Sequence, residues 1–384
     1  MQTTSWIEIS KSALANNISF IEKLVGDKAR FSSVVKGNAY GHGIEVFCPL
    51  AYELGVRHFS TFDAHEAYRV INAVGNKDFE LMIMGAVTND QLEWVIDNGI
   101  EFFVFNYDRL ESVINVAKKL NRKARIHLEF ETGMNRTGFS TRSINTIYKV
   151  LLEYKDYIEL KGICSHLAGA ENIANYKRVQ DQSKRFKKIK RTVESWSEFS
   201  PIYHLTCSAG TLRYPNYLFD LARIGILQYG FFPSTEVHIQ FITKNKVAMN
   251  PLQRIITWKT RVMEVKKVKV GEFVGYGTSF FCNSPKTIVA IPVGYSSGYA
   301  RALSNSGKVL IRGKRLDVIG TVNMNMVIAD ATELDNVEIG DEVVLIGYQG
   351  NAEITVGSFS DYSQQVNYEL LTRLPINIDR TIVA

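Results

Sequence analysis

The sequence lacks long hydrophobic runs and has little cysteine, and both absences narrow what the protein can be. No apolar stretch approaches the ~20 residues that a membrane-spanning helix needs. The opening segment, MQTTSWIEIS, lacks the basic start and apolar core of a secretory signal. The cysteines show neither CxxC pairing nor the spacing of metal ligands; they are Cys48, Cys164, Cys207 and Cys282. We therefore expect a cytoplasmic protein with no metal site and no membrane partner.

The chain also gathers too little basic charge in one place to indicate a nucleic-acid partner. Its formal net charge is +6 over 384 residues, and lysine and arginine are scattered along it. The one dense basic run, KRFKKIKRTVESW at 184–196, is typical of the solvated face of a long helix. No internal repeat or low-complexity linker is visible. We expect no nucleic-acid partner.

What is present is the composition of an ordinary globular enzyme, long enough for two domains. Apolar residues make up 46% of the chain and charged residues 22%. Short apolar runs alternate with amphipathic runs that have helical spacing, such as 45–55, 89–99 and 107–120. The apolar runs are candidate strands at 31–36, 58–63, 80–85, 100–105, 125–131, 160–166, 203–208 and 223–230.

The spacing of these candidate strands decides the expected fold. Helix-length segments separate successive runs, and such crossovers connect parallel strands. Eight strand–helix units predict a (β/α)8 TIM barrel. A doubly wound open sheet is the alternative.

The character of the sequence changes after about Pro233. The segments that follow alternate or stay apolar between Gly and Asn turns, as strands do; they are 254–270, 286–294, 308–312, 315–320 and 337–347. We therefore predict a barrel domain at 1–236 and a C-terminal β-rich domain at 237–384.

Polar residues at strand ends are the first sign of function. Lys36, His166 and Ser208 end their candidate strands, and Arg223 is the one charge in ARIGILQYG. Active sites of TIM barrels gather at the carboxyl ends of the strands. One such residue is more often structural than catalytic, but four together favour a site.

The run RIHLEFE at 125–131 carries ionisable side chains where a barrel strand should be apolar. His127, Glu129 and Glu131 share one face, because side chains alternate along a strand. A solvated edge strand would explain them. The sharper interpretation is an electrostatic site at the top of a barrel, in which Glu129 holds Arg136 from the next loop, since an unpaired inward charge is costly.

The same strand ends indicate an anionic cofactor and a reactive amine. The small residues of SAG at 208–210 and RIGI at 223–226 leave backbone N–H groups open to a phosphate. A lysine in a crowded, partly dry barrel mouth can lose its proton and react with an aldehyde. Pyridoxal 5'-phosphate needs such a lysine, a phosphate cradle and a partner for its ring nitrogen.

An ordered set of motifs resembles the alanine racemase family and covers nearly the whole chain. The motifs are VVKGNAYGHG, ETGMNRTGF, SHLAGAE, RIGILQYG, VGYGTSF, VGYSSGYAR, GTVNMNM and VNYELLTRLP. The resemblance implies a pyridoxal-phosphate-dependent barrel followed by a β domain. It also implies a homodimer with shared active sites and an isomerase that interconverts L- and D-alanine, supplying D-alanine for peptidoglycan.

Matching position by position, the resemblance implies roles for single residues around the cofactor. Lys36 is implied to form a Schiff base with it. Arg223 is implied to face the ring nitrogen, with His166 hydrogen-bonded to Arg223. The implied phosphate-binding residues are Tyr40, Ser208, Gly225, Ile226 and Tyr368.

The substrate side is implied in the same way. Arg136 matches the arginine near the substrate carboxylate, and Met324 matches the residue whose backbone N–H meets that carboxylate. Tyr295 and Arg301 match residues that line the entrance. Inverting the α-carbon requires a base on each face of the cofactor; Lys36 would serve one face and Tyr276 of the partner subunit the other.

The chain departs from the family pattern at several positions, and these put the substrate in doubt more than the chemistry. Many alanine racemases carry a carbamylated lysine where this chain has Glu129, and our hypothesis is that this carboxylate replaces the carbamate. Asn325 near the carboxylate site and Ser297 at the entrance replace acidic residues. Three further positions also differ: Asn323, Cys207 and Thr321.

Three other functions remain to be weighed against alanine racemisation. A racemase of the same mechanism could act on serine or a broader set of amino acids. A cofactor carrier without turnover would not need Tyr276. A barrel-type decarboxylase typically pairs the ring nitrogen with a carboxylate, and Arg223 argues against it.

Overall fold

A computed structural model describes residues 3–247, 249–359 and 367–384 of the chain. Its contacts divide the chain into two compact units. The barrel unit comprises Ala13–Lys36 and Cys48–Arg254. The sheet unit comprises Gly37–Phe47, Ile255–Ala384 and the described residues of Met1–Ser12. The predicted domain boundary at residues 236 and 237 stays a prediction.

In the described part of the barrel unit, eight parallel strands follow the order β8-β7-β6-β5-β4-β3-β2-β9. Each lies within a few residues of a candidate strand of the sequence. The strands are β2 (Arg30–Val34), β3 (His58–Thr61), β4 (Glu80–Ile83), β5 (Glu101–Val104), β6 (Ala124–Glu129), β7 (Ile158–Cys164), β8 (Ile202–His204) and β9 (Leu221–Ile224).

Backbone contacts between the two ends of this sheet bring it close to a closed barrel. The Asp220 N–H donates to the Tyr203 carbonyl at 3.0 Å, and the Arg223 N–H donates to the Thr206 carbonyl at 3.1 Å. The predicted (β/α)8 barrel is therefore confirmed, and the alternative of an open sheet is wrong. Closure leaves no long unpaired edge in this sheet.

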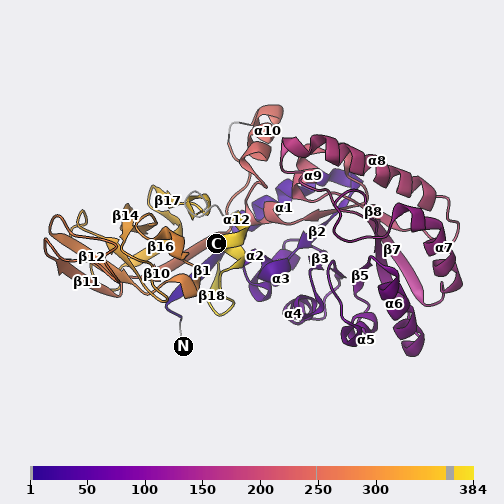
Figure 1. Cartoon of the computed structure of the whole chain (residues 1–384), viewed down its shortest axis with the longest axis horizontal. Helices are drawn as coiled ribbons and strands as arrows, with labels where there is room; N and C mark the ends of the chain where they lie inside the picture. The colour runs from indigo at the N-terminus through magenta and orange to yellow at the C-terminus, as the bar shows by residue number, and fades with distance from the viewer. Residues whose placement is uncertain (1–2, 248, 360–366) are drawn as a thin grey trace. The chain divides into compact units, whose positions relative to one another are not determined.

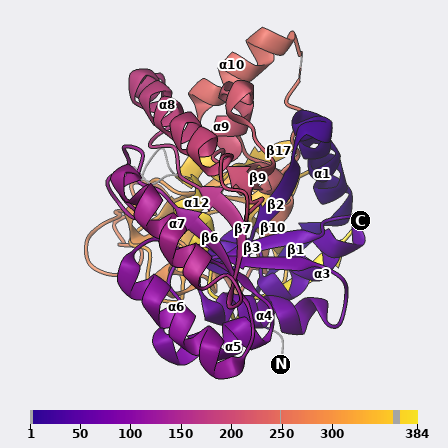
Figure 2. The ribbon, with the colours of Figure 1, turned by 90° about the vertical axis from the view of Figure 1, so that its right-hand side faces the viewer.

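Helices follow the strands and lie outside them, as Figure 2 shows for α4 to α8. Local sequence starts them: the Asp63 carboxylate accepts from the Glu66 N–H at 2.9 Å and caps α4. The helices are α1 (Lys11–Val25), α4 (Ala64–Val74), α5 (Asn89–Asp97), α6 (Tyr107–Leu120), α7 (Ile144–Glu153), α8 (Tyr176–Val193), α9 (Ser208–Arg213) and α10 (Thr235–Asn245). No helix within the described ranges has the length and apolar character needed to cross a bilayer.

The last candidate strand, 223–230, is only half correct. Strand β9 ends at Ile224, and Ile226–Tyr229 form a buried 3-10 turn. The side chain of Gln228 explains the turn, because its Nε2 donates to the Val34 carbonyl at 2.9 Å and its Oε1 accepts from the Ser33 hydroxyl at 2.7 Å. A short apolar run does not distinguish a buried strand from such a turn.

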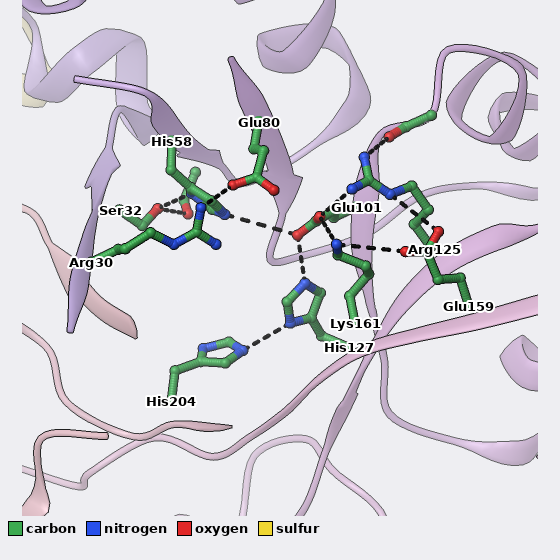
Figure 3. A network of polar contacts seen from close by, with 12 residues as sticks. Arg30, Ser32, His58, Glu80, Glu101, Arg125, His127, Glu159, Lys161 and His204 are labelled. Atoms are coloured by element: carbon green, nitrogen blue, oxygen red, sulfur yellow. Dashed lines mark hydrogen bonds and ion pairs between the residues drawn. The ribbon is translucent and has the colours of Figure 1, made fainter. Parts of the chain in front are cut away.

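A network of ionisable side chains fills the barrel interior (Figure 3). Glu101 is 1% exposed, and its Oε2 accepts from His127 Nε2 at 2.8 Å. The other ring nitrogen of His127 lies 2.9 Å from His204 Nε2. On the second side, His58 Nε2 lies 3.8 Å from Glu101. A Cβ at Gly162 would lie 2.2 Å from His127, so this glycine makes room for the imidazole.

Strand β6, which carries His127, is central rather than an edge. It pairs with β5 on one side and β7 on the other, and Glu129 at its end is 5% exposed. The interpretation of 125–131 as a solvated edge strand is therefore wrong. Ile126 and Leu128 are fully buried on the opposite face.

The sheet unit contains a mixed, mostly antiparallel sheet of 10 strands within the described residues (Figure 1). The predicted β-rich C-terminal region is confirmed. Its first strand comes from the N-terminus, since β1 (Ser5–Ser10) pairs with β10 and β18. The others are β10 (Ile256–Arg261), β11 (Glu264–Val268), β12 (Lys286–Ile291), β13 (Lys308–Ile311), β14 (Lys314–Ile319), β15 (Val327–Asp330), β16 (Glu342–Gln349), β17 (Ala352–Ile354) and β18 (Asp379–Val383).

Candidate active site

Lys36 lies directly after β2, at the start of a strained turn. The segment α2 (Lys36–Tyr40) is left-handed: Gly37, Asn38 and Ala39 have φ values of 63°, 56° and 53°, and Tyr40 has 51°. Only the glycine adopts this region without cost; each other residue costs about 1–2 kcal/mol. Strain of this kind is concentrated at functional sites. The turn thus supports a functional role for the lysine.

Two arginines of the barrel unit act electrostatically on Lys36. The residue is exposed, yet the protein atoms around its ammonium group desolvate it and lower its pKa. The positive charges of Arg136 and Arg223 lower the pKa further. A lysine that loses its proton more easily is a better nucleophile toward a carbonyl group. The sequence prediction of a reactive amine therefore has a physical basis in this structure.

Arg223 is 5% exposed and has one guanidinium nitrogen without a partner among the described residues. Its Nη2 donates to the Ser165 carbonyl at 2.5 Å and to the Leu205 carbonyl at 3.3 Å. Its Nε has no acceptor in the part of the chain that the structure describes. A buried N–H donor without an acceptor is costly, so this atom fits an acceptor supplied by a ligand.

His166 lies near this arginine but does not bond to it directly. Burial lowers the pKa of His166 well below its usual value, and the charges of Arg223, Arg136 and Lys36 add to the effect. No hydrogen bond joins His166 to Arg223 within the part of the chain that the structure describes. At neutral pH the imidazole is therefore uncharged, which avoids a fourth cation in the cluster.

Three of the residues predicted for phosphate binding, Ser208, Gly225 and Ile226, follow β8 and β9 in the barrel unit. Ser208 begins α9, and its hydroxyl oxygen accepts from the Gly225 N–H at 3.0 Å. Ser208 is 5% exposed and Ile226 is 6% exposed. The hydroxyl of Thr206, two residues before Ser208, is buried without a partner in the described chain. This corner of the barrel unit offers polar groups for an anion.

The loop that carries Arg136 is held by a carboxylate different from the predicted one. Glu131 accepts from the backbone N–H groups of Met134, at 2.7 Å, and of Asn135, at 2.7 Å. Glu129 instead accepts from the Thr137 hydroxyl at 2.7 Å. The predicted ion pair between Glu129 and Arg136 is absent within the described residues.

In the sheet unit, the structure brings Tyr40 and Tyr368 together. Their ring centroids lie 6.4 Å apart at an interplanar angle of 76°. Tyr368 lies on α12 (Asn367–Thr372), and a Cβ at Gly41 would lie 1.8 Å from the Leu371 carbonyl oxygen of the same helix. Gly41, with a φ of 80°, is therefore required for this contact.

Tyr276 stands at the tip of a turn in the sheet unit. It is 74% exposed and lies between two glycines with positive φ, Gly275 at 74° and Gly277 at 68°. The Ser279 hydroxyl donates to the Tyr276 carbonyl at 3.4 Å and accepts from Thr321 Oγ1 at 3.0 Å. Ser279 therefore connects the turn to Thr321, one of the positions at which this chain departs from the family pattern. The predicted second base is thus presented on an exposed loop.

Tyr295 and Met324 also lie together in the sheet unit, 41% and 55% exposed. The Tyr295 N–H donates to the Asn323 carbonyl at 3.0 Å, and Ser296 Oγ donates to the Met324 carbonyl at 2.7 Å. Ser296 Oγ also bonds to Asn325 Oδ1 at 2.5 Å, so one of the family departures has a structural partner here. The remaining entrance residues, Ser297 and Arg301, lie in adjacent 3-10 turns.

Sequence reasoning missed the buried polar residues that hold the site residues in place. Gln182, Thr132 and Ser165 are each at most 2% exposed and lie behind His166 and the Arg136 loop. Gln182 was hidden in the helix that contains the basic run. The sequence could have revealed it, because Gln182 lies three residues after Val179 and four before Phe186, on the helix face where an apolar residue is expected.

Two family models together match most of the chain. Residues 9–233 match the model described as "Alanine racemase, N-terminal domain", and residues 255–382 match "Alanine racemase, C-terminal domain". A protein of Leptospira interrogans named alanine racemase is 32% identical over 383 residues, which cover 99% of this chain and 96% of that protein.

Solved structures agree with this similarity. The alanine racemase of Clostridium difficile 630 matches with a TM-score of 0.90 at 25% identity, over 100% of this chain and 96% of that one. A structure from Bartonella henselae, named as alanine racemase with covalently bound pyridoxal phosphate, matches with a TM-score of 0.83 at 27% identity, over 99% of this chain and 100% of that one.

Proposed function

Because this chain belongs to the alanine racemase family, we propose that it interconverts L- and D-alanine with pyridoxal 5'-phosphate as its cofactor. The observation that carries the proposal is the pair formed by Lys36, just beyond β2, and Arg223, near the end of β9. A lysine whose pKa is lowered lies within electrostatic reach of a buried arginine with an unpartnered Nε. The pair combines a reactive amine with a donor for a ring nitrogen.

The residues of this chain fit the cofactor. Lys36 would bind its aldehyde, and the free Nε of Arg223 would donate to its ring nitrogen. Ser208, Gly225 and Ile226 would hold the phosphate, and the family resemblance assigns Tyr40 and Tyr368 to the same role. When bound, pyridoxal phosphate supplies an electron sink that makes the α-proton of an amino acid removable.

The acid–base work is assigned to two side chains. Lys36 Nζ would take or return the α-proton on one face, which its lowered pKa favours. The Tyr276 hydroxyl would act on the other face. Because arginine does not give up its proton in proteins, Arg223 would donate a hydrogen bond to the ring nitrogen of the cofactor without protonating it, and this weaker electron sink would limit side reactions.

Substrate recognition is assigned to Arg136, the Met324 backbone N–H and Tyr295. The guanidinium of Arg136 would pair with the substrate carboxylate, since arginine binds carboxylates with two parallel hydrogen bonds. The alternative, a racemase acting on serine or a broader set of amino acids, gains no support from the relatives, which are named alanine racemases. The product, D-alanine, would serve peptidoglycan.

We further propose a homodimer in which Tyr276 of the partner subunit completes each site, in the cytoplasm of the cell. Exposed aromatic rings beside Tyr276 support an interface there: Phe273 is 50% exposed and Phe281 is 46% exposed. Large apolar side chains gathered on an exposed loop favour burial against another surface.

The test of the reaction is racemisation in heavy water. Purified protein loaded with pyridoxal phosphate is incubated with single L-amino acids in D2O, while α-deuterium and optical rotation are followed. We expect both to change fastest with alanine. Exchange of the α-proton without loss of optical rotation would eliminate the two-base scheme, and faster turnover of serine would favour the alternative substrate.

The test of the shared site is complementation between two inactive variants. Lys36→Ala and Tyr276→Phe proteins are unfolded, mixed and refolded together. If each site combines residues of two subunits, half of the dimers regain one intact site, so about a quarter of the wild-type activity returns. Mixtures that stay inactive would place both residues in one chain.

A further inference from the structure

A glutamine lies on the buried face of α8, where the helix otherwise packs apolar residues. Gln182 is 1% exposed and shares this face with Val179, Phe186 and Ile189. The opposite face carries the basic run, as the sequence predicted; Lys184, Lys187 and Lys188 are among its exposed residues. A buried amide is unfavourable unless its donors and acceptor are bonded. The partners of Gln182 therefore explain why it is there.

The amide of Gln182 pairs with the backbone around His166. Its Nε2 donates to the His166 carbonyl at 2.8 Å, and its Oε1 accepts from the Ala168 N–H at 2.8 Å. The carbonyl can only accept and the N–H can only donate, so the two bonds fix the orientation of the amide. They also fix the backbone from which the His166 side chain projects.

A second branch of the same network reaches Arg223 and the loop after β6. Gln182 Nε2 lies 3.4 Å from Thr132 Oγ1, and the Thr132 hydroxyl lies 2.7 Å from the Ser165 hydroxyl. Ser165 in turn accepts from Arg223 Nη2 through its carbonyl at 2.5 Å. One side chain of α8 therefore connects the backbone behind three of the proposed site residues.

Packing leaves little room for a different arrangement. Gly133, next to Thr132, has a φ of 133°, and a Cβ there would lie 3.2 Å from the Gln182 side chain. On the same helix, Arg185 donates to the Thr132 carbonyl at 2.8 Å and Arg178 donates to the Gly133 carbonyl at 3.0 Å. These two arginines are exposed, whereas Gln182 is buried. The buried bond is the less replaceable one.

We propose that Gln182 is a positioning residue for racemisation: through the backbone at 166–168 and through Thr132, it holds His166 and the Arg136 loop in the geometry that the reaction needs. This inference rests on the proposed function. Gln182 does not reach the reacting atoms. Its effect arises because small displacements of binding groups reduce turnover strongly.

The principal test replaces Gln182 with methionine, which is similar in length and cannot bond to the backbone. We expect kcat/KM for alanine to fall by roughly 10- to 100-fold. The matched control is Gln180→Met on the same helix, because Gln180 accepts from the Tyr217 hydroxyl at 2.6 Å and bonds to none of the proposed site residues. It should stay within about twofold of wild type.

A second variant, Gln182→Glu, is tested by the pH dependence of its activity, which a merely structural role of Gln182 would not change. A protonated carboxyl can donate to the His166 carbonyl and accept from the Ala168 N–H, whereas a carboxylate cannot donate. The charged and titratable neighbours are Arg185 and Arg178 on α8, Glu131 after β6, and His166 after β7, whose imidazole is uncharged at neutral pH. Activity relative to wild type should therefore fall as pH rises, and this variant carries the test if Gln182→Met does not fold.

Hydrogen exchange of the cofactor-free protein separates this inference from the proposed function. Amides at 132–138 and 166–168 should exchange faster in Gln182→Met than in wild type or Gln180→Met. Faster exchange with unchanged kcat/KM would overturn the positioning role, as would equal losses of activity in both methionine variants. If wild-type protein does not racemise alanine at all, the proposed function fails, while the exchange pattern still reports whether Gln182 holds these loops.

Discussion

The barrel contains two clusters of ionisable side chains, and they differ in how charge is compensated. In the interior network of Figure 3, the Glu101 carboxylate lies 2.8 Å from His127 Nε2, 3.1 Å from Arg125 Nη2 and 3.6 Å from Lys161 Nζ. In the site cluster, Lys36, Arg136 and Arg223 are all cations. No ion pair joins any of the three to a carboxylate within the described residues.

The pKa shifts of the two clusters show the consequence. Burial alone would raise the pKa of Glu101, but the hydrogen bond from His127 and the nearby His58 imidazole, whose Nε2 lies 3.8 Å away, outweigh it and hold the pKa well below its usual value. At Lys36, burial and the neighbouring arginines act in the same direction and lower the pKa. The interior network therefore stabilises the negative charge of Glu101. The site cluster instead destabilises the positive charge of Lys36 until an anionic ligand binds.

The largest effect that this comparison predicts is on stability when Glu101 loses its charge. In Glu101→Gln, Arg125, Lys161 and the buried His127 lose their anionic partner, so we expect the free energy of unfolding to fall by about 3 kcal/mol. Urea unfolding of the cofactor-free protein measures it. The control is Glu80→Gln, whose partner Arg30 is mostly exposed, with an expected loss below about 1 kcal/mol. Equal losses in the two variants would remove the distinction between the clusters.

The sequence predicts where the residues of the two clusters lie on the strands better than it predicts which side chains pair with one another. Alternation along 125–131 correctly places His127 and Glu129 on one buried face, and Lys36 lies just beyond β2, as the strand pattern predicts. These are local features, set by the two-residue period of a strand. The barrel and the place of Lys36 beyond its first strand could therefore be predicted from the sequence, whereas the role of Lys36 stays a prediction.

The pairings could not be predicted, because they depend on which strands and loops meet. Glu129 bonds to Thr137 rather than Arg136, and the loop is held by Glu131 instead. Gln182 meets His166 from a helix that begins ten residues further along the chain. No period in the sequence encodes such contacts, and the strand β1, which joins a sheet formed mostly by the C-terminal half, was missed for the same reason.

An effect of intermediate size is the loss of stability at acidic pH. His127 and His204 are fully buried, and burial lowers the pKa of each below its ordinary value. The unfolded chain therefore binds more protons than the folded one below about pH 6.5, and stability falls as pH falls, by up to about 1.4 kcal/mol per pH unit for each group. Unfolding by urea between about pH 7 and pH 5 measures the slope.

A variant separates this slope from general acid sensitivity. His204→Gln removes one titrating group, so its stability should depend less steeply on pH than that of wild type, even if it is less stable throughout. His166 is affected in the same direction, with Arg223, Arg136 and Lys36 as additional causes. Parallel slopes for wild type and His204→Gln would show that the interior histidine does not contribute.

The smallest expected effect has the opposite sign and comes from the site cluster. Lys36→Met removes a cation that two arginines repel, so the cofactor-free protein should become more stable, by about 0.5–1 kcal/mol because solvent screens the exposed lysine. Racemisation should be lost at the same time. Lys188→Met, on the exposed face of α8, is the control and should change stability by less than about 0.5 kcal/mol. A less stable Lys36→Met protein would mean that the lysine contributes to folding, and the contrast with Glu101 would then be one of degree rather than of sign.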